Sequence, residues 1–181
     1  MLKYAVGYSH HGKECENSSS SSSVEGENQS TPIRKPRRAN TKRTGELSEA
    51  AFLLKAKTLG FGVSRPWGDS ERYDFVLDSG HRLWRAQIKC TASVRARGYD
   101  IQPIYTDQTR KAPYTIDDID VLFAHIIPLD IWYVLPVEAF APCKSLRFYP
   151  QGCKRARFEQ YREAWHLLRP KAKAATQGAL L

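Results

Sequence analysis

The sequence predicts an α/β domain, because one helical hydrophobic pattern is followed by several short strand patterns in a chain of 181 residues. A helix is predicted from Gly45 to about Leu59, and two strands joined by a turn from Tyr73 to Cys90. Two further strands are predicted at 121–127 and 131–136. A chain of this length can bury one substantial core, so we expect a single domain with extensions.

The predicted helix has Thr44 as its candidate N-cap and Gly60 as its stop signal. Glu46 and Glu49 lie near its start, where acidic residues are favoured by the helix dipole alone. A functional role for Glu49 therefore depends on which residues lie close to it. The apolar stripe expected to pack on the sheet consists of Leu47, Ala50, Ala51 and Leu54.

The hairpin at 73–90 carries the polar residues of most interest. Asp74 begins its first strand, and Gln87 and Lys89 lie near the end of its second. Because side chains alternate along a strand, the residues of the second strand divide into two faces. A carboxylate, an amide and an ammonium group together fit a hard divalent cation and a phosphate. A half-buried hairpin with one wet face has the same pattern. The core-facing set is Trp84, Ala86, Ile88 and Cys90, and the opposite set is Arg85, Gln87 and Lys89.

The remaining elements complete the predicted domain. A short strand is expected at 61–65, closed by Pro66. The runs at 121–127 and 131–136 are almost wholly apolar, which is typical of strands covered on both faces, so His125 is expected in the core. A last helix is predicted near 158–168, with a docking face made of Phe158, Tyr161, Trp165 and Leu168.

A net charge of +9 and a pI near 9.5 indicate a polyanionic partner, most often nucleic acid. We expect residues 1–43 to form a flexible extension that is serine-rich at 16–32, residues 44–168 the domain, and 169–181 a disordered tail. A basic tail that serves only solubility has the same composition. Tyr99, Tyr105 and Tyr114 lie among basic residues, as in many nucleic-acid contacts. The candidate contacts are Arg34, Lys35, Arg37, Arg38, Lys42, Arg43, Arg95, Arg97, Arg110, Lys111, Lys154, Arg155 and Arg157.

The four cysteines, Cys15, Cys90, Cys143 and Cys153, have no spacing typical of a zinc site. A pairing of Cys143 with Cys153 stays open, and reduced thiols are the simpler expectation. No apolar run approaches the length needed to cross a bilayer, and the start has no signal-peptide pattern. We therefore expect a cytoplasmic, nucleoid-associated protein with no membrane partner.

The order of these elements resembles that of the PD-(D/E)XK nuclease superfamily. The order is a helix with Glu, a strand, a hairpin with Asp and a Gln-x-Lys pair, and then further strands. The chain is most similar to its bacterial endonuclease domain family and to its Holliday junction resolvase and cyanobacterial intron homing endonuclease branches. The matching residues are Gly45–Cys90, with RPWGD at 65–69, YD at 73–74 and QIK at 87–89, and the closing EAWHLL at 163–168. The resemblance implies a restriction-endonuclease-like three-layer core with a central mixed β-sheet of four to five strands flanked by helices (αβββαβ).

The same resemblance implies an Mg²⁺-dependent DNA endonuclease, with Mn²⁺ as a substitute ion. It makes Asp74 the principal metal-binding carboxylate and the Ile88 backbone carbonyl a further ligand. Gln87 takes the place usually held by an acid and is expected to present its amide oxygen. Lys89 is expected to orient or deprotonate the attacking water, and Glu49 to act on the metal through water, with Glu46 as its fallback.

Two departures from the superfamily pattern are visible: Tyr73 precedes Asp74 where Pro is usual, and Gln87 replaces the second acid. The resemblance implies a DNA substrate, which could be branched or structured, and a homodimer that cuts two strands. The alternative is a catalytically inactive DNA-binding protein on the same fold. A basic RNA-associated protein without a site is a third class.

Overall fold

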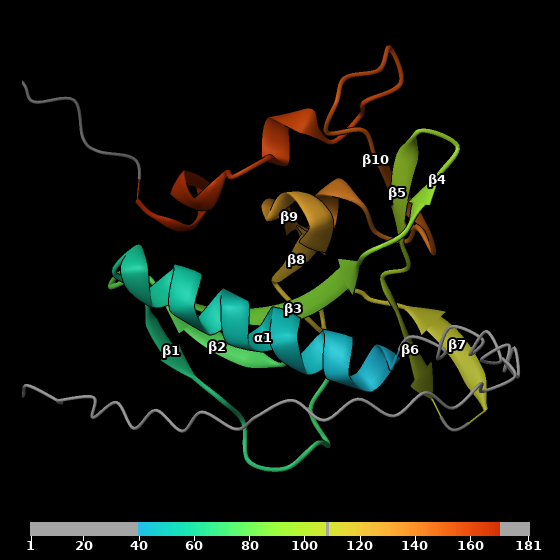
Figure 1. The fold of residues 1–181 in the computed structure, drawn as a ribbon. Coiled ribbons are helices and arrows are strands. Elements are labelled where there is room, and N and C mark those ends of the chain that lie inside the picture. The colour runs from blue at the N-terminus through green and yellow to red at the C-terminus, as the bar shows by residue number, and fades with distance from the viewer. Residues whose placement is uncertain (1–39, 108, 171–181) are drawn as a thin grey trace, which may run out of the picture. The chain divides into compact units, whose positions relative to one another are not determined.

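The structure of the protein is a computed structural model that describes residues 40–107 and 109–170. At its centre is a five-stranded sheet in the order β1-β2-β3-β8-β9 (Figure 1). All neighbouring strands are antiparallel except β3 and β8, which are parallel. The expectation of a mixed sheet of four to five strands is therefore confirmed. The strands are β1 Gly62–Ser64, β2 Phe75–Asp78, β3 Leu83–Thr91, β8 Val121–Ile126 and β9 Ile131–Pro136.

Helix α1 covers one face of this sheet and runs from Thr41 to Thr58. It begins earlier than predicted, because Asn40 rather than Thr44 is its N-cap and accepts a hydrogen bond from the Arg43 backbone N–H at 3.2 Å. Lys42 and Arg43 therefore lie in its first turn. Arg34, Lys35, Arg37 and Arg38 lie outside the described residues.

The buried face of α1 differs from the predicted one. Leu47 and Leu54 are 61% and 71% exposed, whereas Ser48, Phe52 and Ala56 are buried. The Phe52 ring decides this orientation, because it fits among the rings of four core aromatics at centroid distances of 4.7–6.0 Å. Glu49 consequently lies beside the buried stripe. The four aromatics are Phe75, Phe123, Trp132 and Trp165.

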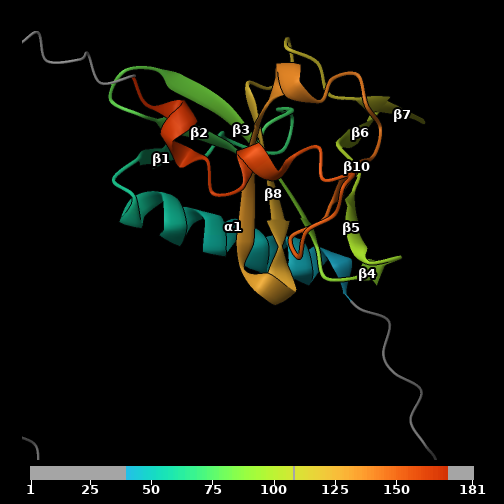
Figure 2. The same ribbon diagram turned by 90° about the horizontal axis from the view of Figure 1, so that it is seen from above.

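The second face of the sheet packs on a core that short strands help to build. The αβββαβ order implied by the resemblance places a helix between β3 and β8. The described residues of that segment contain none, and paired strands take its place. Tyr99 and Tyr114, which the sequence indicated as surface aromatics, are buried in this core. Both views place these short strands on the side opposite β1 and β2 (Figures 1 and 2). They are β4 Val94–Arg95, β5 Gly98–Ile101 and β10 Leu146–Phe148 in one sheet, and β6 Ile104–Asp107 and β7 Arg110–Pro113 in a hairpin.

The predicted helix at 158–168 is wrong: this segment forms two single turns of 3₁₀ helix, Glu159–Tyr161 and Trp165–Leu168. Between them the chain runs along the outer edge of β9. There Arg162 bridges to Tyr133, and the Glu163 backbone N–H donates to the Trp132 carbonyl at 2.7 Å. A continuous helix cannot close a sheet edge in this way. Two other short 3₁₀ turns, Ile127–Leu129 and Val137–Ala139, follow β8 and β9.

His125 is a core residue, as predicted. Its ring stacks on Trp132 at a centroid distance of 3.9 Å, and Nδ1 lies 2.9 Å from the Ser48 hydroxyl of α1. The contact joins helix and sheet, and burial lowers the pKa of His125. Cys90, Cys143 and Cys153 carry free thiols. Among the helices that the structure describes, none has the length and apolarity needed to cross a membrane.

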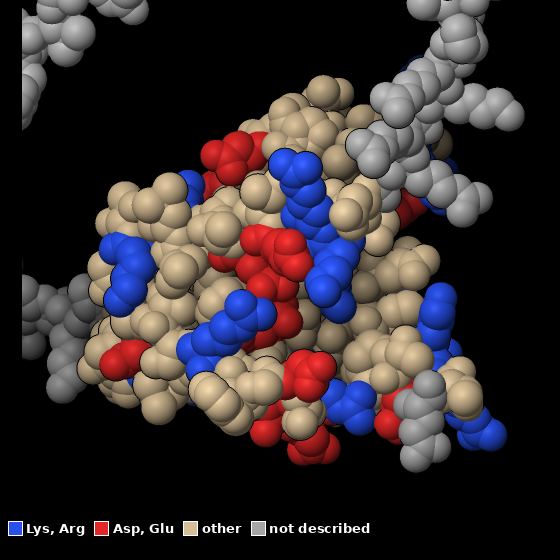
Figure 3. Space-filling model, turned by 60° about the horizontal axis from the view of Figure 1, so that its bottom comes forward, with Lys and Arg blue, Asp and Glu red and all other residues tan. Residues whose placement is uncertain are grey.

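The basic residues proposed as nucleic-acid contacts are on the surface wherever the structure describes them. Figure 3 shows that Lys and Arg side chains are distributed around one face of the molecule, while acidic side chains gather at its centre. No single basic patch covers that face. The exposed residues are Lys42, Arg43, Arg95, Arg97, Arg110, Lys111, Lys154, Arg155 and Arg157.

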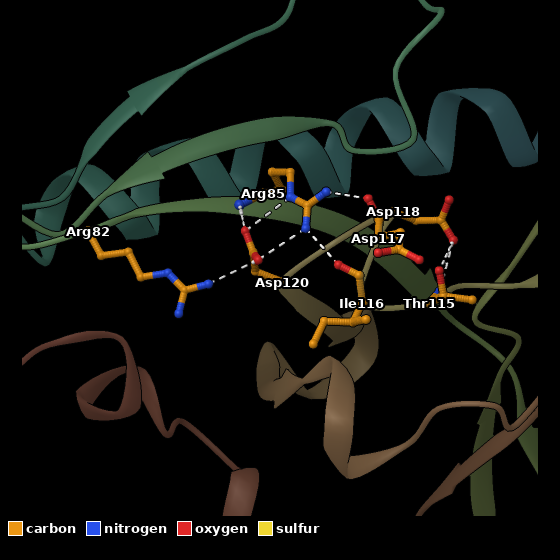
Figure 4. Close-up of polar contacts among 7 residues, drawn as sticks. All are labelled: Arg82, Arg85, Thr115, Ile116, Asp117, Asp118 and Asp120. Carbon is orange, nitrogen blue, oxygen red and sulfur yellow. Dashed lines mark hydrogen bonds and ion pairs between the residues drawn. The ribbon is translucent and has the colours of Figure 1, made fainter.

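A polar network aligns the start of β8 with β3 (Figure 4). The Asp120 carboxylate accepts hydrogen bonds from the Arg85 backbone N–H at 2.7 Å and from the Arg85 and Arg82 guanidinium groups. Arg85 also donates to the backbone carbonyls of Ile116 and Asp117. Burial alone raises the pKa of Asp120, but the bonds from Arg85 outweigh it and the net pKa is lowered. The network thus holds the parallel register at Ala86 and Val121.

Replacing Asp120 with Ala is expected to lower the free energy of unfolding by about 2–3 kcal/mol, because it leaves the Arg85 N–H and guanidinium without their charged acceptor. Urea denaturation followed by circular dichroism measures the change. Asp117→Ala is the matched control: only its backbone carbonyl takes part in the network, so its effect should stay below about 0.5 kcal/mol. Equal effects of both substitutions would contradict this account.

Candidate functional site

The candidate site forms where β2 and β3 separate. The ladder between them ends at Phe75 and Ala86, and the Asp74 backbone N–H donates to the Ala86 carbonyl at 2.9 Å. Beyond this point β3 continues to Thr91 with β8 as its only strand partner in the described sheet. A buried backbone N–H needs an acceptor, and the Asp74 carboxylate provides it: Oδ2 accepts from the Ile88 N–H at 2.8 Å.

The Gln87 side chain completes this arrangement. Gln87 is 5% exposed, and its amide nitrogen donates to Asp74 Oδ2 at 2.6 Å and to the Ile88 carbonyl at 3.2 Å. The amide nitrogen, and not the expected oxygen, therefore faces the two groups. The reason is that a carboxylate and a carbonyl are both acceptors, so they require a donor between them. Both donors use Oδ2, which leaves Asp74 Oδ1 without a hydrogen bond among the described residues.

Burial perturbs the charged groups of this site in opposite directions. It raises the pKa of Asp74, although the Ile88 N–H and the charge of Lys89 act against the rise. It also lowers the pKa of Lys89, against the opposing effect of Asp74. The Lys89 ammonium lies 5.5 Å from the ring centroid of Tyr114. Both side chains therefore bear a desolvation cost that a purely structural hairpin does not require.

Glu49 lies next to this group, on α1. Burial and the charge of Asp74 raise its pKa, and its carboxylate pairs with Arg65 at 3.2 Å. It lines a neighbouring depression of about 830 Å³ between α1 and β1, together with Glu46, which is exposed. The structure thus brings Asp74, the Ile88 carbonyl and the side chains of residues 87 and 89 together, with Glu49 beside them and Glu46 farther out.

A pocket of about 460 Å³ opens over Asp74, Gln87 and Lys89. Its other walls are the loop that precedes β2 and the hairpin formed by β6 and β7. Four carboxylates line it against two cationic side chains, so its charge is negative. The four acids are Asp69, Glu71, Asp74 and Asp107, and the two cations are Arg72 and Lys89.

Three residues of the site had not been predicted from the sequence to belong to it, although Tyr114 had been noted as an aromatic among basic residues. Arg72 lies in the pocket wall, with its guanidinium 3.8 Å above the Tyr105 ring. Tyr114 forms the wall beside Lys89, and Arg65 holds Glu49. The position of Arg72 two residues before Asp74 was a usable signal. Tyr114 gave none, because its burial depends on strands that the sequence pattern did not reveal.

The donor set of the pocket fits one kind of metal ion. In residues 40–107 and 109–170, no three His, Cys, Asp or Glu side chains lie close enough to hold an ion by themselves. Mg²⁺ does not require such a cluster, because it retains waters and commonly binds one or two carboxylates together with substrate phosphates. Asp74 Oδ1, the Ile88 carbonyl and nearby Glu49 are donors of this type. A closed zinc-type site does not fit.

Comparisons with known proteins bear on the family and the fold. A family described as PD-(D/E)XK endonuclease matches residues 39–168. The solved structure of a bacterial homing endonuclease, I-Ssp6803I, is 30% identical, with a TM-score of 0.64, and the match covers 71% of this chain and 93% of that one. The crystal structure of MepB matches at 16% identity and a TM-score of 0.36, over 59% of this chain and 84% of that one. No sequence among the curated proteins matches.

Replacing Gln87 with Glu is expected to lower the free energy of unfolding by about 1–3 kcal/mol without metal, because a buried carboxylate then faces Asp74 and the Ile88 carbonyl. Adding Mg²⁺ should restore stability, since a cation between the acceptors removes the repulsion. Thermal unfolding with EDTA and with Mg²⁺ measures both effects. Gln151→Glu, the same change at an exposed position, should show neither. An unchanged melting temperature for the Gln87 variant in EDTA would refute this reading.

Proposed function

This chain belongs to the PD-(D/E)XK endonuclease family, and from that premise we propose that it is a metal-dependent DNA endonuclease that hydrolyses phosphodiester bonds. The proposal includes Mg²⁺ as the ion, with Mn²⁺ as a substitute. The observation that carries it is the meeting of Asp74, Gln87 and Lys89 in one acid-lined pocket. The Ile88 carbonyl lies next to them, 3.2 Å from the Gln87 amide nitrogen.

In this proposal the oxygen donors of the site hold the ion. Asp74 would bind it through Oδ1, the Ile88 carbonyl would be a further ligand, and Glu49 would act through water. Gln87 contributes its amide oxygen after the amide group turns, because the nitrogen that now bonds Asp74 cannot face a cation. Bound Mg²⁺ supplies Lewis acidity and positive charge at the phosphate.

Lys89 acts on the water and on the phosphate. Its ammonium orients the water that attacks phosphorus and offsets the negative charge that develops as the new P–O bond forms and the leaving P–O bond breaks. Its half-buried position makes this charge more effective than on an open surface, because the local dielectric is lower. Arg72 and Tyr114 shape the pocket around the same phosphate.

The charge of the pocket links metal binding to DNA binding. Four carboxylates and two cations repel a phosphate, whereas the exposed basic residues elsewhere attract the DNA backbone. The acidic residues of the pocket would hold a divalent cation that offsets this local repulsion. Productive DNA binding at the site therefore requires the ion.

We expect the wild-type protein to cut supercoiled plasmid or a four-way junction with Mg²⁺ or Mn²⁺, and Lys89→Ala or Asp74→Ala to lower the rate at least about 100-fold. Gel electrophoresis of the products measures the rate. Lys57→Ala, which removes an exposed lysine in the last turn of α1 that is not among the candidate DNA contacts, is the control and should retain most of the activity.

The products also report the assembly. A homodimer that brings two sites to one duplex converts supercoiled plasmid directly to the linear form, whereas a single site accumulates nicked circles first. Cleavage that survives both substitutions would disprove the site assignment. DNA binding by every form without any cleavage would favour the catalytically inactive DNA-binding protein.

Neutralising Asp74 is expected to tighten DNA binding in EDTA, because one negative charge facing the phosphate is removed. Asp74→Asn should gain about fivefold or more in affinity, equivalent to roughly 1 kcal/mol of relieved repulsion. Fluorescence anisotropy with a labelled duplex measures this. In Mg²⁺ the order should reverse, because the variant has lost a ligand. Asp117→Asn, an exposed site outside the pocket, should change neither affinity by a comparable factor.

A further inference from the structure

The loop between β1 and β2 presents an unusual side chain to solvent. Trp67 is 100% exposed. Trp132 and Trp165, in contrast, are buried in the first core, which is the one that contains Phe52 between α1 and the sheet, and Trp84 packs against that core. Isolated exposed apolar residues are common on proteins. An indole ring with its entire surface in water is different, because a tryptophan normally buries a large part of its area. Trp67 therefore contributes nothing to the described core.

The loop that carries Trp67 is fastened at both ends beside the candidate site. On one side Arg65 pairs with Glu49 at 3.2 Å, and its guanidinium lies 5.8 Å from the Phe75 ring centroid. On the other side Arg72 stacks on Tyr105 at 3.8 Å and pairs with Asp107 at 3.5 Å. These contacts hold the two ends of the loop and leave its tip without contacts of this kind.

The residues that flank Trp67 shape the tip. Pro66 restricts the backbone before it, and Gly68 has a φ of +74°, a conformation that other residues rarely adopt. The chain therefore turns immediately after Trp67. Figure 1 shows this loop projecting beyond the sheet, below β1 and β2. Trp67 thus lies at the tip of a short loop whose backbone is conformationally restricted.

Along the chain, Trp67 lies between residues that line the two hollows of the site. Arg65, two residues before it, lines the depression that contains Glu49. Asp69, two residues after it, lines the pocket that contains Asp74 and Lys89. The loop that carries Trp67 therefore borders the pocket in which a phosphate would meet Lys89.

We infer that Trp67 stacks on a nucleobase of the bound DNA next to the phosphate in the pocket, and that it unstacks this base from its neighbour. This inference rests on the proposed function. Every base offers an aromatic face, so stacking supplies affinity without sequence readout. Aromatic and apolar side chains inserted at a base step also bend duplex DNA.

The charge around Trp67 favours DNA over a membrane surface. Asp69 and Glu71 follow it in the same loop, and an anionic lipid surface presents negative charge continuously to both. A DNA strand instead presents an uncharged base between its phosphates. Asp69 and Glu71 can then face an ion in the pocket while the indole ring stacks on the base.

The experiment uses the full chain with Lys89→Ala, so that DNA is bound and not cut, in Mg²⁺ with a mixed-sequence duplex. Adding Trp67→Ala should weaken binding about ten- to hundredfold, the range for loss of one aromatic stack. Trp67→Phe should retain most of the affinity. Trp67→Leu should bind more weakly than Trp67→Phe, because an aliphatic side chain offers no aromatic face to the base. Leu54→Ala, at a 71% exposed position of α1, is the control and should bind normally.

A second readout reports the base itself. The fluorescence of 2-aminopurine, placed in turn at each position, should rise at the base that loses its stacking neighbour and stay low at the base that stacks on the indole ring. With Trp67→Ala it should stay low at every position. Normal affinity and no 2-aminopurine response in the Ala variant would overturn the inference and leave the nuclease proposal intact. Binding of Trp67 to phosphatidylglycerol vesicles in preference to DNA would also overturn it. Failure of every form to bind DNA would contradict both the proposed nuclease function and the stacking role of Trp67.

Discussion

The hydrogen bond from the Ile88 N–H to the Asp74 carboxylate is the interaction on which the candidate site depends. It exists because β2 leaves β3 after Phe75 and Ala86 while β3 continues beside β8. The carboxylate accepts the hydrogen bond that a neighbouring strand would otherwise accept. It therefore lies beside β3 where β2 has ended, close to the Ile88 carbonyl and the Gln87 amide. A carboxylate that satisfies the backbone in this way has one oxygen committed to the fold and one left for chemistry.

The rest of the fold keeps this edge rigid. β8 has the first core on one face and the second on the other, and the Asp120 network holds its start against β3. The Phe52 ring and the contact between Ser48 and His125 fix α1 on the sheet, which sets where Glu49 lies. Burial strengthens the electrostatic effect of Lys89 and Asp74, and it also opposes their ionisation. The proposed metal ion would offset part of the cost of ionising Asp74 in this buried position. The same pocket would therefore govern both stability and activity.

The sequence predicted those elements that are determined by local pattern. β8 and β9 were found from their continuous apolar runs, and the hairpin that holds Asp74, Gln87 and Lys89 was found from its alternation. The buried face of α1 was predicted wrongly, because two apolar stripes compete and only the fit of Phe52 among other rings decides between them. The helix at 158–168 was wrong because its apolar spacing suits a helix, whereas Phe158 and Trp165 belong to opposite cores.

The sequence by itself determined the family resemblance, which implied the mixed sheet. It also determined the polar residue types gathered near β3, because spacing along one strand decides which side chains share a face. The tertiary structure alone decided that the Gln87 nitrogen faces Asp74, that Arg72 and Tyr114 line the pocket and that Trp67 is fully exposed. These properties depend on distances between segments far apart in the chain. Hydrogen-bond direction, burial and pocket shape arise from that packing, and a linear pattern does not contain them.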